Sequence, residues 1–269
     1  MKFKKLLLNL LLLTIFANFS FAQDIISAAE AKKLANDKST VIVSTRTAED
    51  YAKVHIRNAV NVDINALAST EDPKGILKSP AEVAKLLGEK GIDPSKKIII
   101  YDTGSNKGAG RLYWILKYLG FNDVKVLDGH MQAWRTARGP VTNAATPVKA
   151  VTFTPTVNAK IFADKAYVKS KLNSAAVVDV RDDTEWGEGH IQGAIHFEYK
   201  NVINEDGTLK SKAELETLFN NAGITKNKEV ILYCATSVRA GIVFLALTSV
   251  LDYPNVKVYD GAYNEWKLN

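Results

Sequence analysis

Cys234 is the only cysteine in the chain, and it stands where a short apolar segment ends. Val230–Tyr233 before it has the pattern of a buried strand, and the residues after Ala240 have the pattern of an apolar helix that opens with Gly241. A loop between a strand and a helix can direct successive backbone N–H groups at one point, and the amino end of the helix adds positive potential. These surroundings favour a thiolate, so Cys234 is predicted to be a nucleophile rather than the buried structural thiol that a free cysteine more often is.

Arg239 closes the loop after Cys234 and carries a charge that cannot be titrated away. A guanidinium suits a small dianion with several acceptor oxygens, and the alternative interpretation is a charge that only contacts solvent. The substrate-binding residues predicted to act with Cys234 are Ala235, Thr236, Ser237, Val238, Arg239 and Ala240.

The composition limits what the chain can be. Of its 269 residues 46% are hydrophobic and 24% are charged, which provides for a sizeable core and for solubility. This composition excludes a disordered chain, a collagen and a polytopic membrane protein. A single Cys excludes an intrachain disulfide framework, and one Cys with four His argues against a zinc cage, so no metal is predicted.

The amino terminus has the form of a signal peptide. Three lysines in the first five residues precede the apolar run Leu6–Phe16, and Ser20-Phe21-Ala22 has the small-x-small form that signal peptidase accepts. We predict a signal peptide over residues 1–22 and an exported protein, periplasmic or secreted, with no stable membrane association after cleavage. The alternative is a transmembrane anchor, for which the uncharged run is barely long enough.

Without residues 1–22 the formal charge falls from +6 to +3. This positive charge is too small and too scattered to predict a nucleic-acid partner.

The chain contains a tandem duplication, because several motifs return in the same order at a nearly constant offset. At an offset of 135 residues, Val43–Arg46 and His55–Val60 return as Val178–Arg181 and His190–Ile195. At an offset of 132 residues, Gly75–Ser79 returns as Gly207–Ser211, and Val124–Gly129 with Trp134 returns as Val256–Gly261 with Trp266. The first copy therefore holds three extra residues between its His55 and Gly75.

Each copy alternates short β-branched segments with helical ones, which predicts an α/β fold with a mainly parallel sheet flanked by helices and a site at the carboxyl ends of the strands. The predicted strands are Val41–Val43, Ile98–Ile100, Ala176–Val178 and Val230–Leu232, and the predicted helices are Ala81–Gly88, Arg111–Leu119, Lys212–Asn220 and Gly241–Val250. The domains are predicted over residues 23–142 and 158–269, with a linker over residues 143–157.

These motifs resemble those of the tandem-domain rhodaneses, the thiosulfate or 3-mercaptopyruvate sulfurtransferases. The resemblance rests on the repeated strand ends at Arg46 and Arg181, the repeated His-Ile segments, the Cys loop, and the closing Asp-Gly pairs followed by Trp. In that family the first domain has lost the catalytic Cys. Here Tyr101-Asp102 occupies the place of Tyr233-Cys234, which fits that pattern.

The resemblance implies a two-step sulfur transfer without metal or organic cofactor. Cys234 would take the outer sulfur of a small anionic donor, thiosulfate, release sulfite and pass the sulfur from a persulfide to cyanide or a thiol, with a protein as an alternative acceptor. Mercaptopyruvate-specific members resemble one another in a Gly-Ser-Gly-Val-Thr loop, whereas this loop ends in Arg239 and resembles the thiosulfate-using members. Glu185 stands near the place of an Arg in animal thiosulfate enzymes, so 3-mercaptopyruvate or another sulfane donor stays open.

Two other functional classes are alternatives. The related cell-cycle phosphatases have a Cys-x5-Arg loop, one residue longer than the spacing from Cys234 to Arg239, because phosphate needs a wider cradle. In the second class, a non-enzymatic carrier or sensor, Cys234 would hold sulfur for a partner and the first domain would be a docking surface.

The remaining repeated residues are predicted to serve the fold, because they recur in the copy that lacks Cys. These residues are Arg46, Arg181, His55, His190, Asp128, Asp260, Trp134 and Trp266. Asp179 faces Ser44 in the repeat, so a role near the Cys loop is an alternative, and Asp179, Arg181 and His190 are kept as candidate supporting residues. The loop Asp102–Gly110 is one residue longer than Cys234–Gly241 and is not expected to fold into the same cradle.

Overall fold

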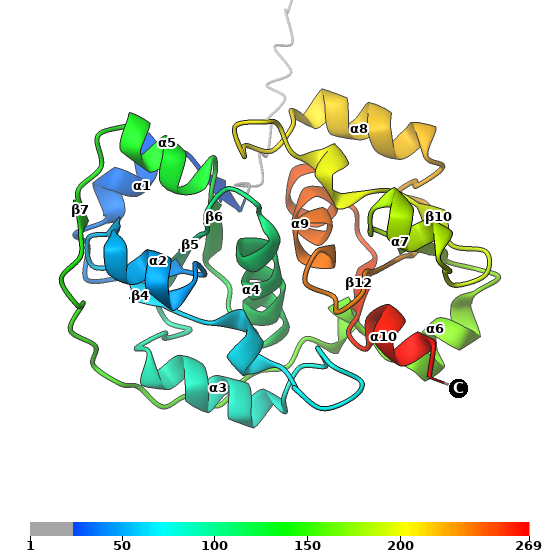
Figure 1. Cartoon of the computed structure of the whole chain (residues 1–269), viewed down its shortest axis with the longest axis horizontal. Helices are drawn as coiled ribbons and strands as arrows, with labels where there is room; N and C mark the ends of the chain where they lie inside the picture. The colour runs from blue at the N-terminus through cyan, green and yellow to red at the C-terminus, as the bar shows by residue number, and fades with distance from the viewer. Residues whose placement is uncertain (1–23, 269) are drawn as a thin grey trace, which may run out of the picture.

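The computed structural model describes residues 24–268, and in this range the duplicated sequence forms two α/β domains (Figure 1). The predicted signal peptide, residues 1–22, lies outside the described residues. Among residues 24–268, none of the helices combines the length and the apolar character that crossing a membrane requires.

The two domains have the same sheet topology, and every pair of neighbouring strands in the two sheets is parallel. The first sheet has the order β1 (Ile25–Ile26), β6 (Val124–Leu127), β5 (Lys97–Tyr101), β2 (Thr40–Ser44) and β4 (Val60–Asn61). The second has the corresponding order β8 (Phe162–Ala163), β12 (Val256–Tyr259), β11 (Val230–Tyr233), β9 (Ala176–Asp179) and β10 (Ile195–His196). A short antiparallel pair joins β3 (His55–Ile56) to β7 (Val141–Thr142). The α/β prediction is confirmed.

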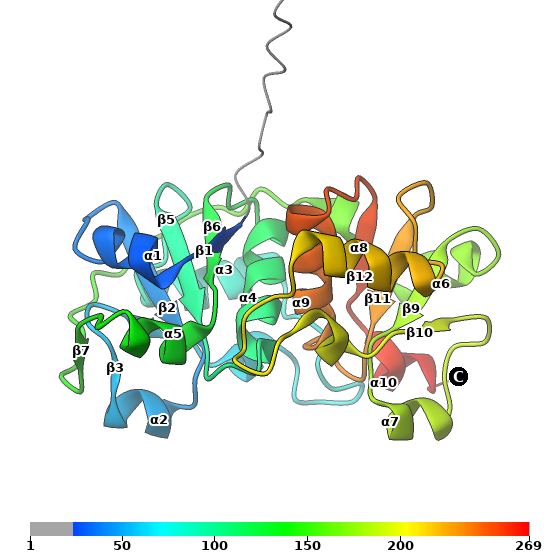
Figure 2. The ribbon, with the colours of Figure 1, turned by 90° about the horizontal axis from the view of Figure 1, so that it is seen from above.

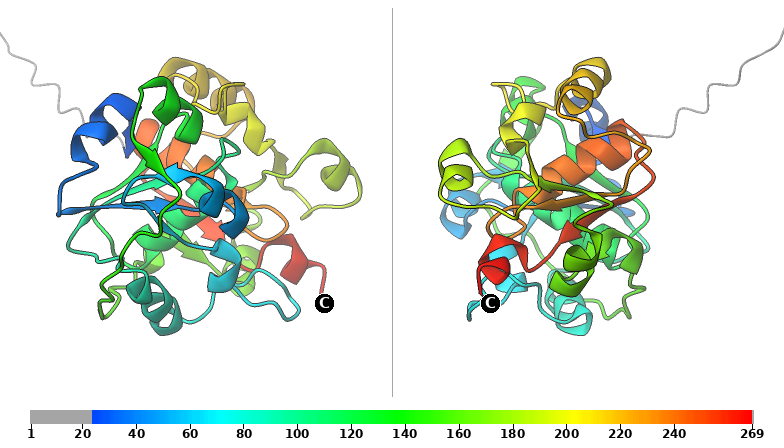
Figure 3. Two further views of the ribbon diagram at one scale, coloured as in Figure 1. Left: turned by 60° about the vertical axis from the view of Figure 1, so that its left-hand side comes forward. Right: turned by 90° about the vertical axis from the view of Figure 1, so that its right-hand side faces the viewer.

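Helices cover both faces of each sheet. Those of the first domain are α1 (Ala28–Leu34), α2 (Ala48–Lys53), α3 (Pro80–Glu89), α4 (Lys107–Tyr118) and α5 (His130–Thr136), with the 3-10 turn η1 (Ile64–Leu67). Those of the second are α6 (Lys165–Lys171), α7 (Asp183–Gly187), α8 (Lys212–Asn221), α9 (Ala240–Leu245) and α10 (Ala262–Trp266), with 3-10 turns η2 (Ala159–Ile161) and η3 (Tyr199–Val202). Figure 3 shows α8 and α10 on opposite sides of the second domain.

The repeated motif that ends in Ser79 and Ser211 explains where two of these helices begin. Each serine side chain accepts a hydrogen bond from the backbone N–H three residues on, and the carboxylate of the glutamate at that position, Glu82 or Glu214, accepts one from the serine N–H. This capping box satisfies N–H groups that a helix start leaves without partners. The same five-residue motif therefore starts α3 and α8 in the same way.

The central strands divide their side chains between two cores, because successive side chains of a strand point to opposite faces. In β5, Ile98 and Ile100 join a core that spans both domains, whereas Ile99 and Tyr101 join a core confined to the first domain. β11 repeats this division, with the second set in a core confined to the second domain. The inner faces of both sheets thus share one core, so neither domain has a complete core of its own.

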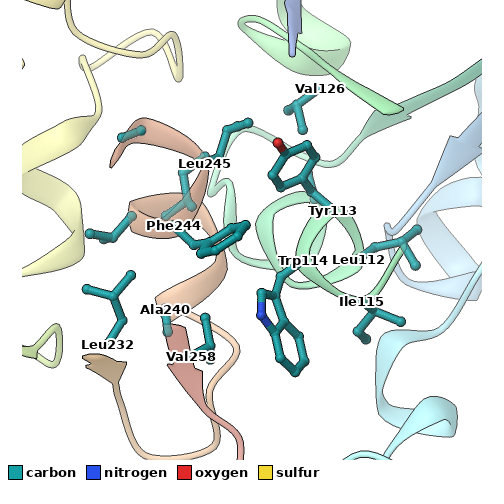
Figure 4. Packing of buried hydrophobic residues seen from close by; sticks show 14 of the residues in the cluster. Leu112, Tyr113, Trp114, Ile115, Val126, Leu232, Ala240, Phe244, Leu245 and Val258 are labelled. Atoms are coloured by element: carbon teal, nitrogen blue, oxygen red, sulfur yellow. The ribbon is translucent and has the colours of Figure 1, made fainter. Parts of the chain in front are cut away.

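Helices α4 and α9 lie side by side at the centre of this shared core (Figures 1 and 2). A Cβ on Gly110 would lie 2.4 Å from the backbone nitrogen of Ile242, and one on Gly241 would lie 2.2 Å from the carbonyl oxygen of Gly110. Tyr113 packs against Phe244 with ring centroids 6.2 Å apart (Figure 4). Glycine at both positions is what lets the two helix backbones touch.

A π-helical turn over Ala246–Val250 (η4) extends α9, and Leu251 N–H donates to the carbonyl of Ala246 at 3.1 Å. This is a bond to the fifth preceding residue, and such a turn holds one more residue than an α-helical turn. The step from Gly241 to Val256 is 15 residues, against 14 from Gly110 to Val124 in the first copy. The π turn accommodates the difference, so the predicted helix Gly241–Val250 is α-helical only at its start.

The predicted linker, residues 143–157, forms neither helix nor strand and runs along the first domain. The N–H groups of Val151, Thr156 and Asn158 donate to the carbonyls of Gly88, Leu119 and Tyr118 at 2.8–3.1 Å. These bonds fix its path along the carboxyl ends of α3 and α4.

Candidate active site

Cys234 lies directly after β11, and its side chain is buried, with 1% of the residue exposed. The carbonyls of Cys234 and Ala235 accept hydrogen bonds from Tyr263 N–H at 2.9 Å and Asn264 N–H at 3.1 Å in α10. The first two carbonyls of the loop are therefore bound by the start of a neighbouring helix.

The N–H groups of residues 235–239 behave differently. Within residues 24–268, none of them donates a hydrogen bond to a protein oxygen or nitrogen. Buried or half-buried N–H groups in a native structure almost always have a partner, so these donors are available to an anion. Ser237 is buried, adopts a left-handed φ of 60°, and its hydroxyl donates to the carbonyls of Tyr259 and, at 3.2 Å, Asp260. The Ser237 side chain thus fixes the loop and leaves substrate contact to the backbone.

Arg239 is paired rather than free. Its Nη2 donates to Glu185 Oε1 at 2.8 Å and its Nη1 donates to Glu185 Oε2, with Asp182 at 3.6 Å. Only 15% of the Arg239 side chain is exposed. Burial by itself would lower the pKa of the guanidinium, but the bonds to Glu185 and the neighbouring Cys234 sulfur raise it above the usual arginine value. Arg239 therefore stays charged beside the thiol, and Glu185 balances that charge.

Asp179 and Arg181 form a second buried pair at the end of β9. Arg181 donates from Nε and Nη2 to Asp179 at 2.6–3.0 Å, and from Nη2 to the carbonyl of Gly189 at 2.6 Å. Asp179 lies beside Tyr233 in the sheet register. Burial raises the pKa of the Tyr233 hydroxyl and the Asp179 charge raises it further, so the hydroxyl stays protonated. This arrangement fits positioning of the strand that leads to Cys234 and gives no contact with the loop N–H groups.

His190 lies apart from the loop, on an exposed face. Its ring stacks on Trp186 with centroids 3.6 Å apart, and His196 stacks on the same Trp186 at 4.8 Å. The equivalent His55 stacks on Tyr51 at 3.8 Å and bonds its carbonyl. The same packing in both domains fits the structural interpretation of this histidine.

The loop of the first domain is a cradle that already holds an anion. Asp102 is buried, and its carboxylate accepts hydrogen bonds from the N–H groups of Gly104, Asn106 and Ala109 at 2.6, 3.3 and 3.3 Å. The expectation that this longer loop would not form a cradle is wrong in one respect: its N–H groups do converge. The physical reason is that the Asp102 carboxylate takes the place of the anion.

Two further contacts close the first cradle. His130 Nδ1 accepts the N–H of Asp102 at 3.1 Å, so its Nε2 carries the proton and donates to Asn106 Oδ1 at 2.7 Å. From the second domain, Gly207 lies against Gly104 and accepts a hydrogen bond from Asn106 Nδ2 at 2.9 Å. Asn106 from its own domain and Gly207 from the other thus cover the first loop.

A pocket of about 320 Å³ lies between the domains beside the Cys loop. Thr236 and Val238 contribute one wall, and Lys74, Gly75 and Arg111 of the first domain contribute to the other. A donor or acceptor that approaches the loop from this side would meet residues of both domains.

Sequence reasoning missed Arg111 and the partner roles of Glu185 and Asp260. Arg111 is 2% exposed, and its Nη2 donates to Asp260 Oδ1 across the domain interface at 2.8 Å. Its Nη1 is buried without a protein partner among the described residues. The available signal was a charged residue at the start of the apolar run Leu112–Leu116 in α4. Among residues 24–268, no group of three or more His, Cys, Asp or Glu could hold a metal ion.

Comparison with known proteins places this geometry in a family. The rhodanese-like domain model matches residues 27–137 and 164–269. The chain is 32% identical to the 3-mercaptopyruvate sulfurtransferase of Escherichia coli (strain K12), over 81% of this chain and 82% of that protein. It is 31% identical to the thiosulfate sulfurtransferase of Pseudomonas aeruginosa, over 84% and 87%.

Among solved structures, the 3-mercaptopyruvate sulfurtransferase SseA of Escherichia coli superposes with a TM-score of 0.84 at 28% identity, covering 90% of this chain and 99% of that one. The likeness extends over both domains. The chain therefore belongs to the rhodanese family of sulfurtransferases, with two rhodanese-like domains.

Proposed function

We propose that the protein transfers the sulfane sulfur of thiosulfate to cyanide or a thiol through a persulfide on Cys234. The Cys234 thiolate attacks the outer sulfur, a new sulfur–sulfur bond forms, the bond to the sulfonate sulfur breaks, and sulfite leaves with the electron pair. The acceptor then attacks the terminal sulfur of the persulfide, and Cys234 leaves as the thiolate. No general base is needed when the thiol is already ionised.

The observation that carries this proposal is the Cys234 loop itself. The lone thiol stands at its start, and the N–H groups of residues 235–239 have no protein acceptor among the described residues. Such donors would stabilise a thiolate and a persulfide, and the charge that develops on sulfur during transfer. The cation at Arg239 lies beside the same sulfur.

A second donor, 3-mercaptopyruvate, is favoured by a different observation. Glu185 binds both terminal nitrogens of Arg239, so a dianion would have to compete with a carboxylate for this guanidinium. A donor with a single negative charge suits a neutralised pair better than thiosulfate does. The name of the Escherichia coli relative points to the same donor.

The test is covalent capture followed by turnover. Incubation with thiosulfate is expected to add one sulfur atom, about 32 Da, to the wild-type protein and nothing to Cys234→Ser. Thiocyanate should then form over many cycles when cyanide is added. Mass gain in Cys234→Ser would remove Cys234 from its role, and a persulfide that forms without repeated turnover would favour the carrier or sensor alternative. Formation of the persulfide, with release of pyruvate, from 3-mercaptopyruvate but not from thiosulfate would select the second donor.

We also propose that the chain is exported and acts outside the cytoplasm, on the basis of the signal-like residues 1–22. Expression of the full chain in a bacterium and sequencing of the accumulated protein should give an amino terminus at Gln23 in the periplasm or medium. An uncleaved protein in the cytoplasm would contradict this proposal.

A further inference from the structure

We propose that Asp260 is a positioning residue through which the Cys-less first domain fixes the geometry of the Cys234 loop. The inference concerns the loop of the proposed function, but it is argued from contacts that do not depend on the donor. It assigns the first domain a part in shaping the reactive site, beyond forming one wall of a pocket.

The Asp260 carboxylate accepts hydrogen bonds from two groups of the first domain. One carboxylate oxygen accepts from Arg111 Nη2 at 2.8 Å, and the other accepts from the N–H of Leu77 at 2.8 Å. Arg111 Nη2 also donates to the carbonyl of Gly75 at 3.3 Å. Asp260 is 3% exposed, and its bond to Arg111 is a buried charge-assisted bond of the kind that fixes geometry, while the bond from Leu77 is partly buried.

From the same position, the backbone around Asp260 holds the Cys loop. The hydroxyl of Ser237 donates to the carbonyls of Tyr259 and Asp260. Three and four residues after Asp260, the N–H groups of Tyr263 and Asn264 hold the carbonyls of Cys234 and Ala235. A displacement of Asp260 would therefore displace the loop at Cys234 and Ala235, where it begins, and at Ser237, in its middle.

Residues 75–77 of the first domain, which include the Leu77 N–H bound by Asp260, also contact the Cys234 loop directly. A Cβ on Gly75 would lie 2.7 Å from the Cβ of Thr236, so the first-domain backbone at Gly75 packs directly against the Thr236 side chain. Asp260 thus links the two sides: its carboxylate binds Arg111 and Leu77 of the first domain, and its backbone carbonyl accepts from Ser237 in the Cys loop. These contacts form one network that crosses the domain interface and is buried at Arg111, Ser237 and Asp260.

The duplication supplies a matched control. Asp128 is the counterpart of Asp260 and accepts from the N–H of Leu209 at 2.9 Å, as Asp260 accepts from Leu77. Among residues 24–268, Asp128 pairs with no arginine, and burial raises the pKa of its carboxyl. His130, two residues further on, binds the loop that carries Asp102, so losing the Asp128 bond is expected to weaken the interface without affecting the Cys234 loop.

The charges around the thiol allow the direction of the effect to be predicted. Arg239 with Glu185 and Asp182, and the pair Asp179–Arg181, surround the loop from its own domain, and Arg111 with Asp260 faces it from the interface. Loss of the Asp260 charge alone would favour the thiolate. Loss of loop geometry would disfavour it, because the N–H donors would no longer converge.

The experiment measures iodoacetamide alkylation of Cys234, the only thiol in the chain, as a function of pH. Asp260→Asn keeps the size but has one acceptor oxygen for two donors. We expect the midpoint of its pH–rate profile to move upward by roughly half a unit to one unit, as loss of about one hydrogen bond to the thiolate would give. Ser237→Ala should move it in the same direction by cutting the network at the loop. Asp128→Ala should leave it in place although its melting temperature falls.

An unchanged or lower midpoint in Asp260→Asn, or an equal shift in Asp128→Ala, would overturn the proposal. If Asp260→Asn does not fold, Ser237→Ala is the deciding variant, and an unchanged midpoint of its pH–rate profile would also overturn the proposal. Alkylation needs no sulfur donor, so a wild-type protein that is alkylated normally but forms no persulfide would refute the proposed function and leave this inference standing.

Discussion

At the scale of single residues, the pair formed by Arg239 and Glu185 governs the charge next to Cys234. Arg239 is permanently protonated, and Glu185 meets its guanidinium with both carboxylate oxygens. A substrate anion must therefore compete with a carboxylate that is already in place. Opposite changes at these two residues should have opposite effects on the binding of thiosulfate.

Arg239→Ala should raise the KM for thiosulfate and lower kcat/KM by roughly 1.5–3 kcal/mol, the range for a hydrogen bond to a charged group. The measurement is steady-state thiocyanate formation, with circular dichroism to show that the variant is folded. Unaltered kinetics would mean that Arg239 serves Glu185 alone.

Glu185→Gln should have the reverse effect, because it removes the competing charge and leaves a neutral partner for the guanidinium. We expect kcat/KM for thiosulfate to rise by about 3- to 10-fold, since one partly buried charge contact is exchanged for a neutral one. The kinetics with 3-mercaptopyruvate should change less. A loss of activity with both donors would show that the pair holds the loop in shape.

His130 makes stability depend on pH. Burial lowers the pKa of this imidazole, although the carboxylates of Asp102 and Asp128 oppose the shift. The unfolded chain therefore binds a proton in a pH range where the folded chain does not, so this group's contribution to stability is lost as the pH falls below about 6.5. His130→Asn, which suits the left-handed φ of 49° at this position, should lose less in melting temperature between pH 7.5 and 5.5 than the wild type does. An equal loss in both proteins would place the acid sensitivity elsewhere.

At the scale of elements, the two loops after β5 and β11 show how a loop can keep its converging N–H groups and yet not bind a substrate anion. Both direct N–H groups at one place, but in the first loop the Asp102 carboxylate accepts them and Asn106 and His130 close the space. Replacement of the carboxylate by a thiol restores a nucleophile but opens no path to it.

Asp102→Cys in a Cys234→Ser background should therefore show no thiosulfate turnover. The thiol would lie behind Asn106 and against Gly104, where Gly207 of the other domain is packed. The assay is thiocyanate formation beside Cys234→Ser alone, with mass spectrometry for a persulfide. Turnover near that of the wild type would mean that the first loop admits a donor as it stands.

The pattern of continuous apolar runs was sufficient to predict the central strands β2, β5, β9 and β11, because each of them is buried on both faces. The prediction of α4 began four residues late, since Gly108 and Gly110 suggested a loop; the structure needs them small because Thr45 and α9 lie against them. Cys234 and its loop were predicted because the only cysteine stands between the pattern of a buried strand and that of an apolar helix. The Glu185–Arg239 pair and the Asp102 cradle could not be predicted, because they depend on contacts between segments far apart in the chain. A sequence periodicity of two or 3.6 residues indicates a strand or a helix and does not indicate such contacts.

At the scale of the whole molecule, the shared core makes the two domains one unit of stability. The inner faces of both sheets pack on the same cluster, and α4 touches α9 backbone to backbone at Gly110 and Gly241. Unfolding of one domain would expose the core of the other. A single unfolding transition is therefore expected despite the duplicated sequence.

Gly110→Ala should test this contact, because the added Cβ meets backbone atoms that cannot rotate away. We expect about 3 kcal/mol of destabilisation, or roughly 5–10 °C in melting temperature for a chain of this size, with the transition still single. Gly187→Ala is the matched control, since a Cβ there meets nothing within 4 Å and should leave stability unchanged or slightly raised. Two separate transitions in the wild type would contradict the shared core.

The π turn in the second domain makes the length of the Cys loop independent of the sheet around it. The second loop is one residue shorter than the first, and the turn over Ala246–Val250 restores that residue before Val256 enters the sheet. The change is thus absorbed inside one helix, and β12 keeps the register of its counterpart β6. Evolution, or an engineer, could lengthen the loop by one residue and delete one from the π turn while both ends stay where they are. A fold with this property can change the anion that its loop accepts without being rebuilt.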